Sequence, residues 1–176
     1  EEQESLAERH QEGEESQGAI VLFIVINPIR EMGLENFSVP SDMWAPFFGA
    51  PIASMYVQPH IGGDMALMCG MAKVLIERRL VDQKFVKAAT EGYDEFIAGL
   101  NELDWDTIEA RSGVSRQQIE ELALAYGRAK NAVFGWTMGI THHLHGVDNV
   151  RMIVNLCLMR GMVGKPHAGL LPIRGH

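Results

Sequence analysis

AVFGWTMGITHHLHGVDNVRMIVNLCLMRGMVGKPHAGLLPIRGH, residues 132–176, is the stretch that decides the fold. It begins with Ala132–Trp136, which is apolar and rich in β-forming residues and therefore predicts a buried strand. A polar turn punctuated by glycines follows at 139–146 and holds His142, His143 and His145. A strand that leads into such a turn is typical of α/β proteins, which bind ligands at the carboxyl edge of a parallel sheet.

A helix is predicted directly after this turn. Its apolar residues recur at i, i+3, i+4, i+7 and i+8, which places them on one helical face: Val150, Ile153, Val154, Cys157 and Leu158. The helix should stop near Gly161 and Gly164, because Pro166 bars its continuation. A second glycine-rich loop then closes the stretch. The expected fold class is α/β, with helices flanking a partial Rossmann-like parallel sheet.

The charge of the chain is unevenly distributed. The 176 residues are 47% hydrophobic and carry a formal net charge of −8. Residues 1–17 contribute −6 of this, from seven Glu and one Arg, so the remainder carries only −2. We expect residues 1–18 to be an acidic disordered tail and residues 19–176 to be the folded part. The acidic balance argues against nucleic acid as a partner, because phosphates attract the opposite charge.

The two cysteines, Cys69 and Cys157, lie far apart in apolar helical patterns. This usage indicates a reducing compartment, the cytoplasm, and not a disulfide framework or a cysteine metal site. The acidic start does not look like a signal peptide. The apolar run Ala19–Ile26 is far too short to span a membrane, so no membrane partner is expected.

Ala19–Ile26 is rich in β-branched residues and predicts a strand buried on both faces, as in a parallel sheet. It ends at Asn27-Pro28, and Arg30 follows; on spacing alone these residues form a strand-terminating turn. Residues 31–60 are irregular, with room for one helical turn. Three aromatic residues are the expected anchors of this long loop: Trp44, Phe47 and Phe48.

Ile61-Gly62-Gly63-Asp64 should open a buried helix that runs to about Arg79. Two glycines at a helix N-terminus allow a phosphate or another polar ligand to approach free backbone N–H groups. Asp64 can cap the helix or accept hydrogen bonds from a guanine edge, and capping is the simpler interpretation. Short scaffold helices follow up to about Lys130, with Asp82 as the cap of one and Ser115 as the cap of the last.

Four linked motifs resemble one continuous block of the formate dehydrogenase alpha subunit. They are Met138-Gly139-Ile140-Thr141-His142, Gly146-Val147-Asp148-Asn149-Val150, Gly164-Lys165-Pro166-His167-Ala168-Gly169 and Pro172-Ile173-Arg174-Gly175-His176. The enzymes that carry this block are molybdopterin-dependent oxidoreductases with two guanine-dinucleotide pterins. The resemblance covers roughly residues 19–176, and the order of the motifs is more specific than any one of them.

The resemblance implies a cofactor, molybdenum or tungsten held by bis-molybdopterin guanine dinucleotide. Nine residues stand at positions that would bind it: Asn27, Arg30, Gly62, Gly63, Asp64, Met138, Gly139, Thr141 and His142. The family has Asp-Pro-Arg where this chain has Asn27-Pro28-Ile29-Arg30, so the Arg comes one residue late. His142 stands where the family has Gln, which makes it a hydrogen-bonding substitute and not a metal ligand.

Arg174 and His176 are the catalytic residues that the resemblance implies. In the family's Pro-x-Arg-Gly-Gln motif, the Arg lies at the metal and orients formate. Arg174 matches, and its guanidinium can hold a carboxylate bidentately. His176 replaces the Gln and adds a group that titrates near neutrality. The implied reaction takes formate to CO₂, with electrons passing to electron-transfer subunits.

The resemblance also implies a larger enzyme. In the family the cysteine or selenocysteine ligand of the metal precedes the block, and a second pterin-binding region follows it. Cys69 and Cys157 do not match that ligand. We therefore expect an internal fragment of a catalytic subunit that is inactive alone, with an iron–sulfur cluster possible only in the missing N-terminal part.

Two other functions stay open from the residues alone. One is a non-enzymatic α/β module that binds a nucleotide at the helix start of Gly62–Asp64 and at the Gly139 turn. The other is a zinc protein that uses His143 and His145, for which Asp148 is the nearby carboxylate. The leading hypothesis requires the histidine turn and the Arg174 bend to converge above neighbouring strand edges.

Overall fold

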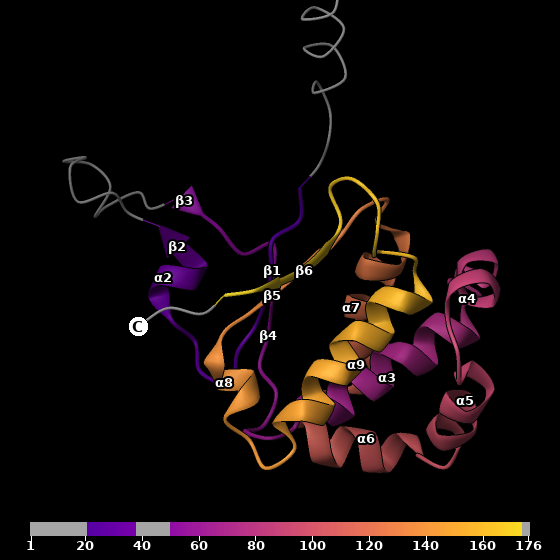
Figure 1. The fold of residues 1–176 in the computed structure, drawn as a ribbon. Coiled ribbons are helices and arrows are strands. Elements are labelled where there is room, and N and C mark those ends of the chain that lie inside the picture. The colour runs from indigo at the N-terminus through magenta and orange to yellow at the C-terminus, as the bar shows by residue number, and fades with distance from the viewer. Residues whose placement is uncertain (1–20, 38–49, 174–176) are drawn as a thin grey trace, which may run out of the picture. The chain divides into compact units, whose positions relative to one another are not determined.

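The structure, a computed structural model, describes residues 21–37 and 50–173 (Figure 1). It divides into two compact units, one from 1–25 and 30–56 and the other from 26–29 and 57–176. The predictions made for the acidic tail, for the aromatic anchors of the long loop, and for Arg174 and His176 lie outside the described residues.

The first unit holds short elements. They are β1 (Ile24–Ile26), α2 (Met32–Glu35), β2 (Asn36–Phe37), β3 (Ala50–Pro51) and β4 (Met55–Val57), with Ile26 and Val57 belonging to the second unit. β2 pairs antiparallel with β3, and β1 pairs with β4. The prediction of a strand buried on both faces is wrong for the described part, since Val21 is 83% exposed and Phe23 48%. A two-stranded sheet supplies too few neighbours to cover both faces.

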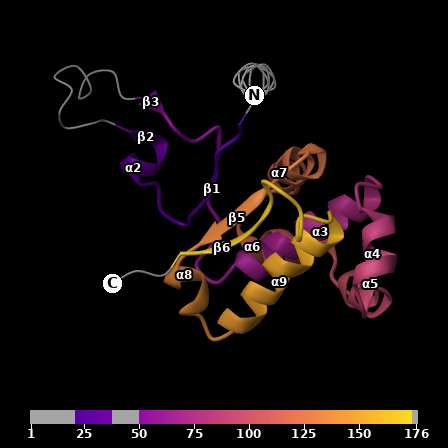
Figure 2. The ribbon, with the colours of Figure 1, turned by 45° about the horizontal axis from the view of Figure 1, so that its top comes forward.

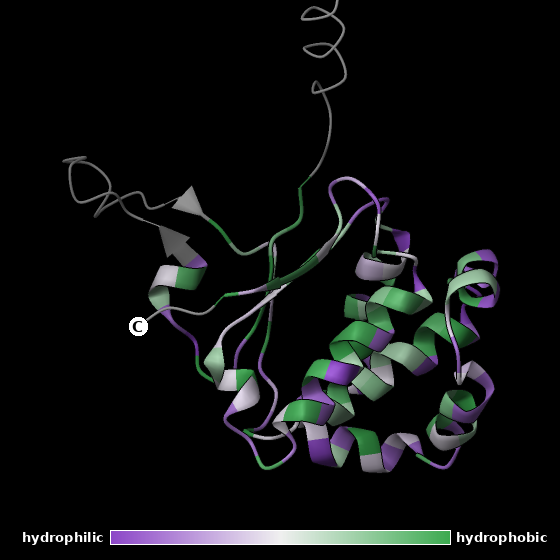
Figure 3. Ribbon diagram, viewed as in Figure 1, coloured by the Kyte–Doolittle hydropathy of each residue, from purple (hydrophilic) through white to green (hydrophobic). Residues whose placement is uncertain are grey.

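The second unit is built around one buried helix. Its long helices have these bounds: α3 (Asp64–Glu77), α4 (Gln83–Ala89), α5 (Tyr93–Asn101), α6 (Trp105–Ser112), α7 (Arg116–Arg128) and α9 (Gly146–Met159). α3 packs against α6, α7 and α9 (Figure 1). In Figure 3 these packed helices carry much of the green that marks hydrophobic residues. In the described residues, no helix is long and apolar enough to cross a membrane.

The positions and caps of the helices confirm the sequence predictions. Asp82 Oδ1 accepts a hydrogen bond from Phe85 N, and Ser115 accepts one from Gln118 N. α9 ends at Met159, just before Gly161. The apolar face predicted for α9 is only partly right: Ile153 and Cys157 are buried, but Val150, Val154 and Leu158 are only half-buried, and the buried face turns toward Met152, Leu156 and Met159. The capping interpretation of Asp64 is wrong, since Gly63 is the N-cap of α3 and that end has no side-chain cap.

A parallel strand pair stands beside these helices. β5 (Val133–Trp136) runs parallel to β6 (Gly169–Pro172), with Trp136 opposite Pro172 (Figure 2). This pair confirms the α/β fold class with a small parallel sheet. β5 lies where a strand was predicted but is not fully buried, since Val133 is 57% exposed. β6 was not predicted, because Gly and Pro residues dominate its sequence.

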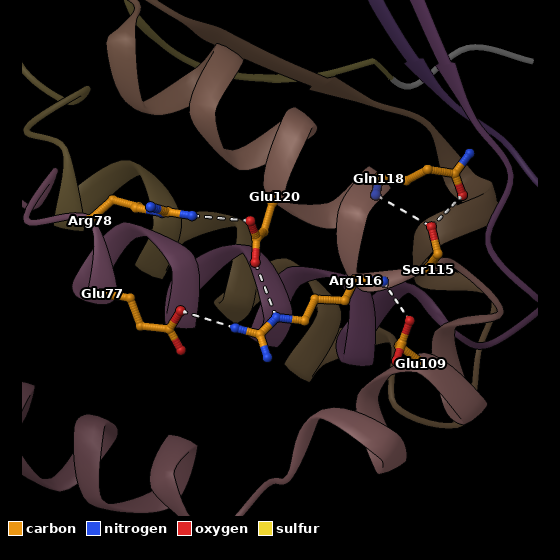
Figure 4. Close-up of polar contacts among 7 residues, drawn as sticks. All are labelled: Glu77, Arg78, Glu109, Ser115, Arg116, Gln118 and Glu120. Atoms are coloured by element: carbon orange, nitrogen blue, oxygen red, sulfur yellow. Dashed lines mark hydrogen bonds and ion pairs between the residues drawn. The ribbon is translucent and has the colours of Figure 1, made fainter.

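Arg116 ties three helices together on the surface of the second unit (Figure 4). Its guanidinium lies 3.0 Å from Glu120 and 3.8 Å from Glu77, and its carbon stands 4.4 Å from the centre of the Trp105 ring. Arg78 reaches the other oxygen of Glu120 at 3.1 Å. The cluster joins the end of α3 to the starts of α6 and α7, and so holds α6 in place.

This cluster should make stability depend on pH. The hydrogen bond from Arg116 holds the pKa of Glu120 below its ordinary value of 4.5. A depressed pKa means that the carboxylate stabilises the fold above that value and that this contribution is lost as the pH falls through the folded-state pKa. Glu120→Gln should therefore be less stable than wild type at neutral pH and equally stable in acid, as measured by urea unfolding midpoints. Glu121→Gln, whose partner is neutral Gln117, is the control; an effect of Glu120→Gln that does not change with pH would contradict the assignment.

Candidate functional site

The turn that follows β5 is more ordered than the sequence indicated. Its first part is a short helix, α8 (Met138–Thr141), and Thr141 Oγ1 donates to the Met138 carbonyl at 2.9 Å. Gly146 N donates to the His143 carbonyl at 3.0 Å. The buried Asn149 side chain donates to the Ile140 carbonyl at 3.2 Å from the first turn of α9. Backbone contacts thus fix the turn that carries the histidines.

The turn before α3 is clamped to the end of α6. His60 N donates to the Ser112 carbonyl at 2.7 Å, and Gly63 N donates to the His60 carbonyl at 2.8 Å. A Cβ on Gly63 would stand 2.7 Å from the Arg111 carbonyl oxygen, so only glycine permits this approach. Gly62 has φ +81°, a conformation that L-residues with side chains rarely adopt. Both glycines are required by this geometry.

These two turns meet at an imidazole–carboxylate pair. His143 Nε2 lies 3.9 Å from Asp64 Oδ2, and both side chains are largely covered, with exposures of 24% and 17%. The pair brings the Gly62–Asp64 stretch and the histidine turn to one place, although they are far apart in sequence. From the sequence, His143 was expected either as a polar turn residue packed around a cofactor or as a zinc ligand. No local pattern signals its partner, because tertiary packing selects it.

The two longest helices that begin here, α3 and α9, have no side-chain cap at their N-termini. The N-caps of α3 and α9 are Gly63 and His145, and neither makes a side-chain cap hydrogen bond. By contrast α4, α6 and α7 are capped by side chains. The first N–H groups of a helix have no partner inside the helix, and with the helix dipole they favour an anion. The arrangement is thus suited to phosphate.

The other predicted residues fall in three places. Asn27, at the end of β1, donates from Nδ2 to the Ile29 carbonyl at 2.8 Å, and its backbone N donates to the Val57 carbonyl. Met138, Gly139, Thr141 and His142 all lie on α8 or its C-cap. Arg30 belongs to the first unit, where its guanidinium lies 3.3 Å from Glu35 and 5.7 Å from the ring centre of Tyr56.

The approach to Arg174 is described although Arg174 itself is not. Ile173 N donates to the Trp136 carbonyl at 2.8 Å, which continues the parallel ladder. The chain therefore continues beyond β6 from the same sheet edge at which it continues from β5 into α8. The convergence of the histidine turn with the Arg174 bend stays a prediction, because Ile173 is the last described residue.

A cavity of about 450 Å³ opens beside the imidazole–carboxylate pair. It lies among α3, α6 and the start of α9. Its lining combines apolar and polar side chains: Gly62, Met65, Ala66, Cys69, Leu103, Thr107, Ile108, Arg111, His143, Leu144, His145, Asp148 and Asn149.

A metal site does not emerge from the described residues. No three His, Cys, Asp or Glu side chains gather there in a way that could hold an ion. Both cysteines are free and buried. Burial raises the pKa of the Cys69 thiol and raises that of Cys157 to about 12. Neither thiol is primed as a ligand or nucleophile, because both roles need the thiolate.

Comparison with known proteins identifies relatives for most of the chain. A family model described as molybdopterin oxidoreductase matches residues 41–174. Protein YdeP of Escherichia coli strain K12 is 43% identical over 165 residues, which is 87% of this chain and 22% of YdeP. Formate dehydrogenase H of the same strain is 38% identical over 126 residues, or 72% of this chain and 18% of that protein.

A relative of lower sequence identity and a solved structure match the same chain. The uncharacterized oxidoreductase Rv2900c of Mycobacterium tuberculosis is 35% identical over 160 residues, covering 87% of this chain and 20% of the relative. The solved structure of acetylene hydratase from Pelobacter acetylenicus matches 83% of this chain and 18% of that chain with a TM-score of 0.69. At 20% identity this match shows the fold alone. The chain spans about a fifth of the length of the curated relatives it matches.

Proposed function

The chain belongs to the molybdopterin oxidoreductase family, and from this premise we propose that it supplies one dinucleotide-binding face of a formate dehydrogenase-like catalytic subunit. Full enzymes of the family carry a molybdenum- or tungsten-pterin cofactor. The proposal assigns the guanine-dinucleotide end of one pterin to the edge where the Gly62–Asp64 turn meets the histidine turn at His143. The observation that carries it is the His143–Asp64 pair between the uncapped ends of α3 and α9.

The donor set of this edge fits such a group. The free N–H groups at the start of α3 suit a diphosphate. The Asp64 carboxylate can accept the paired N–H donors of a guanine edge, and the imidazole of His142 offers a further hydrogen-bonding group. A Cβ on Gly139 would meet nothing within 4 Å, so the backbone there is open to close approach. Asn27, which follows β1, belongs to the same unit as this edge.

The chemistry proposed for the whole enzyme is formate oxidation. When bound, the metal–pterin group accepts the two electrons that formate releases on becoming CO₂ and a proton. Arg174 orients formate through a bidentate contact to its carboxylate. His176 is the group that we assign to hold or move a proton. Electrons then leave to a redox partner, for which separate electron-transfer subunits are our proposal.

A chimeric enzyme tests this function. The part of this chain that matches formate dehydrogenase H would replace its counterpart in that enzyme, and metal–pterin content and formate oxidation would both be measured. We expect both to be retained. Asp64→Asn should lower cofactor retention at least about tenfold, since a hydrogen bond to a charged group contributes roughly 1.5–3 kcal/mol. Arg174→Lys should leave cofactor content unchanged and reduce turnover at least about tenfold, because lysine cannot bind bidentately.

The controls separate cofactor binding from substrate chemistry. Asp82→Asn removes a carboxylate at the cap of α4 and keeps a good capping residue, so neither readout should change. If the chimera held the cofactor but did not oxidise formate, the assignment of the dinucleotide-binding face would stand and formate would be excluded as the substrate. Loss of the cofactor together with tight GDP binding by the 176-residue chain would favour the alternative, a nucleotide-binding module without redox chemistry.

A further inference from the structure

We propose that the cavity among α3, α6 and the start of α9 binds a small organic acid with an apolar body, and that Arg111 holds its carboxylate. This ligand is chemically distinct from the pterin group and from formate, although its cavity borders the proposed dinucleotide edge at Gly62 and His143. Its class follows from the shape of the cavity, from the apolar wall, and from the one charge in the lining that lacks a counter-ion within the described chain.

The size and wall of the cavity suit a compact apolar group. At about 450 Å³ it falls within the range of small-molecule sites, roughly 300–1,000 Å³. Met65, Ala66 and Cys69 come from one face of α3, and Leu103 and Ile108 from the opposite side. Ile108 and Cys69 are almost fully buried, so the floor is rigid and apolar. The apolar part of a ligand bound here would be removed from water, and no core side chain would have to move to admit it.

The polar side of the cavity selects a negative head group. Asp148 is paired with Arg151 at 3.1 Å, and His143 lies beside Asp64. Arg111 also lines the cavity, yet its guanidinium makes no ion pair with any described residue. A guanidinium remains charged at all working pH values and binds a carboxylate through two parallel hydrogen bonds. The lining therefore favours an acid over an alcohol or an amine of equal size.

The experiment compares acids with alcohols on the full 176-residue chain. Butyrate, hexanoate, octanoate and 1-hexanol would be titrated by ligand-observed NMR. Each added methylene should tighten binding about fourfold, since burying one contributes about 0.8 kcal/mol. Hexanoate should bind about tenfold more tightly than 1-hexanol, which reflects one charge-assisted contact.

Variants identify the head-group contact. Arg111→Met should abolish the preference for hexanoate and leave the affinity for 1-hexanol unchanged, a result that a merely structural role would not give. Asp148→Asn should bind hexanoate as tightly as wild type or more tightly, because it removes a negative charge from the lining. Ala66→Phe should fill the cavity and prevent binding of both. Arg128→Met, which removes an exposed arginine outside the lining, is the matched control.

Two outcomes would overturn the proposal. One is an affinity that does not rise with chain length, which would mean that the apolar wall is not used. The other is an Arg111→Met variant that still prefers hexanoate, which would mean that another cation binds the carboxylate. Circular dichroism of each variant should match wild type, since Arg111 and Asp148 are exposed and Ala66 is partly exposed.

Discussion

Gly146→Ala should lower the free energy of unfolding by about 3 kcal/mol, at the upper end of what overpacking costs. A Cβ at this position would stand 2.3 Å from the Thr141 carbonyl oxygen and 2.8 Å from its carbon. Both are backbone atoms, so no side-chain rotation relieves the clash. Either α9 moves away from α8 or the histidine turn opens. Urea unfolding followed by circular dichroism would measure the loss.

Gly139→Ala provides the matched control within the same turn. A Cβ there meets nothing within 4 Å, and the residue lies in the short helix α8. We expect a change within about 0.5 kcal/mol of wild type, as for ordinary surface substitutions. Equal losses for the two variants would show that the close approach of Thr141 to Gly146 does not hold the turn. Histidine chemical shifts should move only in Gly146→Ala, because that variant alone displaces His143.

The helices were predictable from sequence because their determinants are local. A capping residue such as Asp82 or Ser115 and an apolar repeat of three or four residues act within one or two turns of chain. The strand β5 was also predicted, since apolar β-formers are followed at once by a polar turn. The family motifs added the order of the turns, and the parallel pairing of β5 with β6 places the ends of these two strands at one sheet edge.

The failures concern contacts between distant parts of the chain. Nothing near Asp64 in sequence indicates that it faces His143 and leaves the cap of α3 to Gly63. The expected burial of Val21 and Val133 was wrong because burial depends on how many layers cover a sheet, and each described sheet has two strands. β6 was missed because hydrogen bonds to β5 impose the extended conformation on Gly169–Pro172, which its own residues do not favour.

Gly63→Ala should also lower the free energy of unfolding by about 3 kcal/mol, through a clash at a different contact. A Cβ here would lie 2.7 Å from the Arg111 carbonyl oxygen and 3.0 Å from both the His60 carbonyl oxygen and Ser112 Cα. All three neighbours are backbone atoms, and two belong to the end of α6. The substitution must therefore separate the turn before α3 from α6. Since α6 packs on α3, the cost reaches the core of the second unit.

Gly99→Ala separates this effect from the general consequence of placing alanine at a glycine. Gly99 lies inside α5, and a Cβ there meets nothing within 4 Å. Alanine should stabilise that helix by about 0.5–1 kcal/mol, because glycine loses more backbone entropy on folding. The two variants should thus shift the urea midpoint in opposite directions. If Gly63→Ala were as stable as wild type, the turn before α3 could accept a side chain. The close packing of this turn on α6 would then not be what holds Asp64 beside His143.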